Sequence, residues 1–264
     1  MTARLSRRRG AVLVTGLVVL RMVWDAAGGA CPKMSVAACI GVSAALVALV
    51  CGIGFGARAV WLGVSTARAV TDLPRQQCDP ALVAAARSAG LSRVDCVVAA
   101  APSAFTAGLV RPRVSVTSAA VTALDPQELQ AVLVHESAHV RRRDPLRRVL
   151  IKAATDVVFF VPALRWWGER QRESSELAAD RSAIERVGRK AVAGALLATA
   201  TGGAPSLTAA FDAPVAARTA QLLDDPIPAR PVPLRLVLLS FVGAVTAVSL
   251  LMCIGQTALT VLSR

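Results

Sequence analysis

The chain contains only two histidines, and both belong to one short motif, His135-Glu136-Ser137-Ala138-His139. Residues four apart share one face of an α-helix, so both imidazoles can reach a single metal ion. Glu136 projects about 100° around the helix from His135, which places its carboxylate beside the metal rather than on it. There Glu136 can take a proton from a zinc-activated water and pass it to a leaving amine. The motif therefore predicts one zinc ion per chain, with His135 and His139 as ligands and Glu136 as the catalytic base.

A second acidic segment lies downstream, at residues 173–180 (ESSELAAD). Catalytic zinc needs a third protein ligand and an open fourth position. Glu176 and Asp180 are four apart and can both face the first helix, so we expect Glu176 to ligate zinc. Asp180 can then accept a hydrogen bond from the other nitrogen of a histidine and fix its tautomer. Glu173 is a competing ligand one turn earlier, and a solvated acidic face is the alternative without chemistry.

The group that stabilises the transition state is harder to identify from the sequence. Peptide hydrolysis produces an oxyanion that usually receives a second donor besides zinc. The chain has no third histidine and no tyrosine to serve as this donor. Arg181, directly after Asp180, is one candidate, and Arg111 and Arg113 are others. For each of them, plain surface charge is the alternative.

The helix that carries the histidine motif has a clear beginning. Asp125 is a helix N-cap, Pro126 occupies the first helical position and Glu128 completes a capping box. We expect this helix to run over residues 126–143 and to stop at Asp144 and Pro145.

Shorter elements precede that helix. Asp79 and Pro80 begin a short helix that Gly90 ends. The β-branched stretches that follow are separated by proline and glycine, and they indicate a small sheet with an edge strand. The predicted strands are 94–98, 103–106 and 113–117. Residues 201–233 are rich in proline and predict a loop-rich connection. The expected fold class is α+β and mainly helical.

The composition indicates a membrane protein. Hydrophobic residues make up 55% of the 264-residue chain, which excludes intrinsic disorder and argues against an ordinary soluble protein. Residues 34–57 and 237–262 are uncharged and long enough to cross a bilayer. Residues 11–27 are a weaker candidate that contains Arg21, and a cleaved signal peptide is the rival interpretation of that segment. The six cysteines show no pattern of a disulfide framework or a cysteine zinc site.

The distribution of arginine predicts the topology. Four arginines within the first nine residues place the N-terminus in the cytoplasm, so the chain returns and the middle, about 58–233, is cytoplasmic. We therefore expect a membrane hairpin over 1–64, a cytoplasmic zinc peptidase domain over 65–233 and a C-terminal transmembrane helix over 234–264. This accounts for most of the formal net charge of +13 without nucleic acid.

A further apolar run, residues 148–164, lies between the predicted metal ligands. It cannot be a complete span, because Glu176 would then lie across the membrane from both histidines. Lys152 and Asp156 would each cost about 2.5–3.5 kcal/mol at the bilayer centre. We expect a buried or interfacial helix instead, with Trp166 and Trp167 at the level of the headgroups.

The combination of HESAH with ELAAD resembles the gluzincin membrane peptidases, namely the BlaR/MecR-type family and its relatives of the HtpX and CAAX-prenyl-protease type. Several segments within about 95–225 resemble the BlaR/MecR-type branch: AFTAGLVRPRV at 104–114, HVRRRDPLRR at 139–148, VPALRWWGERQRESSELAAD at 161–180 and RTAQLL at 218–223. The resemblance implies zinc, an α+β catalytic core and peptide-bond hydrolysis. It also implies that a strand containing Phe105, Thr106, Ala107 and Gly108 binds an extended substrate by strand addition. Because the given chain ends after its last apolar segment, we expect no penicillin-binding sensor domain.

These observations predict a multi-pass zinc endopeptidase of the cell membrane with a cytoplasmic active site. Its expected partners are the lipid bilayer and a protein substrate, such as a cytoplasmic transcriptional repressor in regulatory proteolysis. A quality-control protease of the HtpX type and a catalytically silent zinc-binding membrane adaptor are the alternatives. Direct binding of nucleic acid is not expected, because the arginines flank helices without interleaved aromatic residues.

Overall fold

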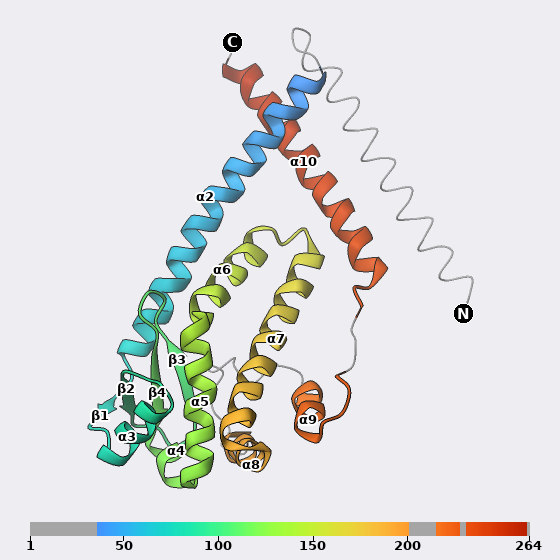
Figure 1. Ribbon diagram of the computed structural model, residues 1–264. Helices are drawn as coiled ribbons and strands as arrows, with labels where there is room; N and C mark the ends of the chain where they lie inside the picture. The colour runs from blue at the N-terminus through green and yellow to red at the C-terminus, as the bar shows by residue number, and fades with distance from the viewer. Residues whose placement is uncertain (1–35, 201–214, 228–230, 263–264) are drawn as a thin grey trace. The chain divides into compact units, whose positions relative to one another are not determined.

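The computed structural model describes residues 36–200, 215–227 and 231–262 of the chain, and most of these residues are helical. Figure 1 shows the elements, whose bounds are α2 Val36–Thr71, β1 Arg75–Gln76, α3 Pro80–Ser88, β2 Val94–Val97, β3 Ala104–Ala107, β4 Arg113–Thr117, α4 Ser118–Ala123, α5 Pro126–Arg142, α6 Asp144–Val157, α7 Pro162–Val187, α8 Arg189–Ala200, α9 Val215–Leu223 and α10 Leu234–Leu262. The expected fold, mainly helical with a small sheet, is confirmed.

The chain divides into two compact units. The first unit comprises Met1–Arg58, Ala154–Trp166 and Pro231–Arg264, and the second comprises Ala59–Ala153 and Trp167–Arg230. Within the first unit, Arg58 of α2 forms an ion pair with Asp156 of α6, with 2.8 Å between Nη2 and Oδ2. The first unit therefore joins segments that lie far apart in the sequence.

The apolar surface of α2 is consistent with a membrane helix. Among the described residues, one helix is long and apolar enough to cross a bilayer, over Ala44–Thr71, and the rest of the protein buries none of its apolar stretch. The apolar stretch of α10, Leu234–Leu250, is shorter. The predicted span 11–27 lies outside the described residues. Three transmembrane helices therefore stay a prediction.

A mixed four-stranded sheet forms the framework of the second unit. The strand order is β1-β2-β4-β3, with β2 parallel to β4 and the other pairs antiparallel, so β3 is an edge strand. One face of the sheet packs against α3 and α5, where Val114 and Val116 are fully buried with Leu133 of α5. The three predicted strands are present, each within one residue of its predicted bounds. The short strand β1 has no predicted counterpart.

The predicted capping box begins α5. The side chain of Asp125 accepts hydrogen bonds from the backbone N–H groups of Gln127 and Glu128, and the Glu128 carboxylate accepts one from the Asp125 N–H. At the other end, Arg143 adopts a left-handed conformation with φ of 53° and ends the helix, so that α6 begins at Asp144 without an intervening loop.

Two expectations about the later elements are wrong. The apolar run 148–164 is not a single helix, because α6 ends at Val157 and α7 begins at Pro162. Proline disfavours helical conformation in the residue before it and is well suited to the first position of a helix, so the chain breaks there. The stretch 201–233 is not merely a connection, because it contains the helix α9.

Candidate metal centre

Three buried side chains from two helices bring their ligand atoms together. His135 and His139 lie on α5 and Glu176 on α7, and their ligand atoms all lie within 4.8 Å of one another. The Nε2 atoms of the two histidines are 3.1 Å apart. The nearest Glu176 oxygens are 3.4 Å from His135 Nε2 and 3.6 Å from His139 Nε2. Glu176 is completely buried.

This donor set fits zinc. Ligands bound at about 2.0–2.2 Å in tetrahedral geometry lie roughly 3.3–3.6 Å apart, which is close to the separations observed here. Two imidazole nitrogens and a carboxylate oxygen are also ligand types that catalytic zinc uses. In addition, Glu176 Oε2 is buried and has no hydrogen-bond partner among the described residues. A buried oxygen in this state is satisfied by a cation.

Asp180 orients His135. Its Oδ1 lies 2.9 Å from Nδ1 of His135, which leaves Nε2 directed toward the other two ligands. Asp180 is itself held by Arg218 of α9, whose Nε and Nη2 donate hydrogen bonds of 2.6 and 2.7 Å to the two carboxylate oxygens. All three side chains are buried. A bidentate arginine of this kind fixes the orientation of the carboxylate and compensates its charge.

Asp144 orients His139 as Asp180 orients His135, and the sequence did not predict this role. Its Oδ2 lies 2.7 Å from Nδ1 of His139 and also accepts a hydrogen bond from the hydroxyl of Ser175 on α7. The left-handed Arg143 ends α5, and Asp144 follows it directly as the first residue of α6. The sequence places Asp144 five residues after His139, where it looks like a helix stop rather than a partner of the metal ligand.

The carboxylates stabilise positive charge at this centre. Burial lowers the pKa of His135, but the nearby carboxylates of Asp180 and Glu176 outweigh burial and raise this pKa to about 10. Burial also lowers the pKa of His139, but Asp144 and Glu176 outweigh burial, so this pKa is raised as well. Although burial favours the protonated acid, the two histidines hold the pKa of Glu176 well below its usual range. Without metal, protons on the histidines therefore supply the positive charge that a bound cation would bring.

Glu136 lies next to the metal ligands and contacts the edge strand. Its carboxylate Oε2 accepts a hydrogen bond of 2.6 Å from the hydroxyl of Thr106 on β3. The same hydroxyl lies 3.2 Å from the backbone oxygen of Glu136. Glu136 is buried, at 3% exposure, and lies at the wall of a cavity. The predicted base and the predicted substrate strand are thus in direct contact.

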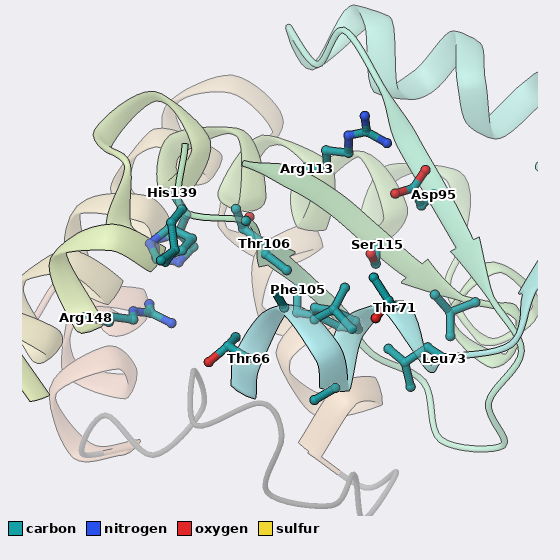
Figure 2. A pocket seen from close by; sticks show the side chains of 18 of the residues that line it. Thr66, Thr71, Leu73, Asp95, Phe105, Thr106, Arg113, Ser115, His139 and Arg148 are labelled. Carbon is teal, nitrogen blue, oxygen red and sulfur yellow. The ribbon is translucent and has the colours of Figure 1, made fainter. Parts of the chain in front are cut away.

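The cavity next to the metal centre has a volume of about 810 Å³. Figure 2 shows Thr66 and Thr71 of α2 on one side of it, Phe105 and Ser115 of the sheet opposite, and His139 at one end. Gly108, the last residue of the predicted substrate strand, also lines it and has a φ of +100°. A Cβ at this glycine would lie 2.8 Å from the backbone oxygen of Arg111, so the turn after β3 requires glycine.

The arginines that the sequence suggested as oxyanion donors differ in their placement. Arg181 is exposed and does not line the cavity, whereas Arg111 and Arg113 are exposed and do line it. The arginine nearest the metal centre is Arg148 of α6, which the sequence did not indicate. Its Nη2 donates a hydrogen bond to Oε1 of Glu176. Arg148 shares the cavity wall with Glu136 and His139.

Glu173, the competing candidate ligand, does not join the donor group of the described residues. It is buried one turn before Glu176 on α7, and its Oε2 is paired with Nη1 of Arg170 at 3.3 Å. Between the two glutamates, the structure brings Glu176 to the histidines.

Comparison with known proteins gives the family. The family model described as BlaR1 peptidase M56 matches residues 24–222, which include all the ligand atoms and orienting carboxylates of the centre. The chain therefore belongs to the BlaR1 peptidase M56 family, a family of membrane-associated metallopeptidases. No curated protein and no solved structure matches the chain significantly.

Proposed function

We propose that the chain is an integral membrane zinc endopeptidase that hydrolyses peptide bonds of a protein substrate. One observation supports this most directly: the ligand atoms of His135, His139 and Glu176 converge, and His139 and the adjacent Glu136 line one cavity. A structural zinc site is normally closed by four protein ligands. Three ligands and an adjacent carboxylate instead favour catalysis over the alternative of a silent adaptor.

Bound zinc would polarise the scissile carbonyl and make water acidic enough to attack at neutral pH. Glu136 receives the proton of the attacking water and delivers it to the nitrogen of the leaving amine. Thr106 holds the Glu136 carboxylate by its hydroxyl hydrogen bond, which limits the rotation of the carboxylate between these two steps. Asp180 and Asp144 bond to Nδ1 of the two histidines and so direct each Nε2 at the metal.

The substrate binds as an additional strand beside β3. The sheet leaves the outer edge of β3 without a neighbouring strand among the described residues, and Phe105, Thr106, Ala107 and Gly108 occupy this edge or its end. Backbone groups of an edge strand can pair with an extended peptide. A peptide paired there passes Thr106 and therefore comes close to Glu136.

The active site faces the cytoplasm, and the protein crosses the membrane more than once. The apolar stretch of α2 and the arginine-rich sequence after it support this orientation. A reporter fused after Arg68, near the end of α2, should give a cytoplasmic signal. A periplasmic signal would reverse the orientation and exclude cytoplasmic substrates.

The substrate is a regulatory protein, such as a cytoplasmic transcriptional repressor. Glu136→Gln should bind zinc and substrate without cleaving, so proteins crosslinked to this variant in cells identify the substrate. Capture of one repressor, cleaved by the unmodified chain at a single site, supports regulatory proteolysis. Capture of many misfolded membrane proteins would favour the alternative of HtpX-type quality control. Absence of zinc-dependent cleavage of any captured protein would favour a silent adaptor.

A further inference from the structure

The cavity beside the metal centre is formed by the second face of the sheet. On β4, Val114 and Val116 face the core, so Arg113, Ser115 and Thr117 point to the opposite face. These residues line the cavity together with Phe105 of β3, and residues 62–71 of α2 with Leu73 form the facing wall. The cavity therefore extends along the sheet, away from the metal ligands.

The same cavity is continuous with the reaction site. Its lining contains Glu136 and His139 in addition to the residues on the face of the sheet. Thr106 marks the point of contact, since its hydroxyl bonds to Glu136 while the neighbouring Phe105 and Ala107 line the cavity. A peptide whose scissile bond lies at Glu136 must therefore place nearby residues in or over this cavity.

The lining is strongly cationic. Outside the metal centre, one carboxylate, Asp95, lies among the lining residues, whereas the arginines are Arg75, Arg111, Arg113 and Arg172. Within the described part of the chain, none of these four arginines forms an ion pair with a carboxylate. Lys152 adds a further positive charge. Glu136 and Asp144 of the centre also line the cavity, but their carboxylates bond to Thr106, His139 and Ser175 rather than to these four arginines.

We propose that this cavity selects an acidic segment of the substrate within a few residues of the scissile bond, a specificity that rests on the proposed peptidase function. Arg113 pairs in register with Ala107, the residue after Thr106, and Arg111 lies in the turn beyond it. At about 3.3 Å per residue of extended chain, these arginines meet residues about two to four positions from the scissile bond. A cleft lined by charge of one sign concentrates its field and attracts the opposite charge.

The first test measures binding without cleavage. The full-length Glu136→Gln variant, loaded with zinc in nanodiscs of neutral lipid, is titrated with three fluorescent peptides. The peptides share one apolar scissile pair, and the flanking residues are Glu, Gln or Lys. We expect the Glu peptide to bind at least tenfold more tightly than the Lys peptide, with the Gln peptide between them. The preference should decrease with added salt, because the cavity is open to solvent.

Two charge-reversal variants locate the effect. When Arg111→Glu and Arg113→Glu are added to the Glu136→Gln variant, the order of the three peptide affinities should disappear or be inverted. The control, Arg186→Glu with Lys190→Glu, changes the net charge by the same amount at exposed residues that do not line the cavity. This control should keep the preference for the Glu peptide. Equal binding of the three peptides, or equal effects of the two double variants, would overturn the proposal.

The second test separates this proposal from the proposed function. The unmodified zinc-loaded chain should cleave the Glu peptide with at least tenfold higher kcat/KM than the Lys peptide. If no peptide is cleaved but the Glu peptide still binds preferentially, the peptidase function fails and the cavity assignment stands. If all three are cleaved and bound equally, the function stands and the assignment fails. The Arg111 and Arg113 substitutions could also weaken binding to phosphatidylglycerol vesicles and leave peptide binding unchanged. That result would contradict the cavity assignment, since lipid headgroups would then be the ligand.

Discussion

The hydroxyl of Thr106 donates a 2.6 Å hydrogen bond to the carboxylate of Glu136, which joins the edge strand β3 to the helix that carries both histidines. This contact connects two parts of the proposed mechanism, because Thr106 bonds to the proposed base and also lies in the proposed substrate strand. A shift of β3 on substrate binding would therefore move the hydroxyl that holds the Glu136 carboxylate.

Thr106→Val removes this hydrogen bond while keeping the shape of the side chain. Hydrogen bonds to charged groups contribute about 1.5–3 kcal/mol, so we expect kcat/KM for peptide cleavage to fall by about tenfold or more. Zinc content, measured by mass spectrometry, should not change, because among the described residues the Thr106 hydroxyl bonds to Glu136 and not to a proposed ligand. Thr106→Ser keeps the hydroxyl and should restore most of the activity. Equal activity of the Val and Ser variants would show that the contact has no role in catalysis.

Asp144→Asn should weaken zinc binding. The amide keeps the size of the side chain but no longer favours the tautomer of His139 that presents Nε2 to the metal. Loss of an orienting partner typically lowers metal affinity by about 10–100-fold. Competition with a chelator of known affinity measures the change. Asp95→Asn, a carboxylate of the same cavity away from the metal, is the matched control and should bind zinc normally.

Arg218→Met should destabilise the metal-free protein. The substitution leaves the buried Asp180 charge without its bidentate partner, which costs about 3–5 kcal/mol of the free energy of unfolding. The double variant Arg218→Met with Asp180→Asn should recover part of this loss. Arg189→Ala removes an exposed pair with Asp224 and should change the free energy by less than about 1 kcal/mol. Denaturant unfolding in detergent provides the comparison, and equal effects of the two arginine variants would contradict the role assigned to Arg218.

Zinc binding should release protons. The pKa of His135 is about 10 in the folded metal-free protein and that of His139 is also raised, so at pH 8 zinc displaces about one to two protons. Calorimetry in two buffers of different ionisation enthalpy counts these protons. Asp180→Asn should lower the number, because it removes the main partner that raises the pKa of His135.

The same shift determines how the metal-free protein responds to pH. The pKa of His135 is near 6.5 in the unfolded chain and about 10 in the folded protein, so protonated His135 favours folding. Its contribution to stability is complete below pH 6.5 and is lost as the pH rises through 10. Unfolding measurements from pH 6 to 10 should show this decline in the metal-free protein. In Asp180→Asn the decline should be smaller.

Local sequence patterns were enough to predict the site's central helix and the sheet. The capping box at Asp125 fixed the start of α5, and the spacing of the two histidines fixed the face they share. Contacts between distant segments were not visible in this way. Arg218 is 38 positions from Asp180, and its role depends on the helix α9, which the prolines around it concealed.

Backbone geometry explains the other differences. Asp144, which contacts His139, follows the left-handed Arg143, a conformation that is uncommon for an arginine and has no signal in the sequence. Arg148 of α6 reaches Glu176 of α7, which lies 28 positions later in the chain, and local sequence patterns do not reveal such a contact between helices. By contrast, Pro162 itself predicts a break in the helix, and treating 148–164 as one apolar run overlooked it.

The central claim is that His135, His139 and Glu176 hold one zinc ion and that Glu136 performs the proton transfers. The most direct measurement determines zinc content and peptide cleavage in the same samples of the full-length protein and its Glu136→Gln variant. We predict one zinc per chain in both samples, and cleavage only by the unmodified chain. Normal cleavage by Glu136→Gln, or no zinc in the unmodified chain, would contradict the proposed mechanism.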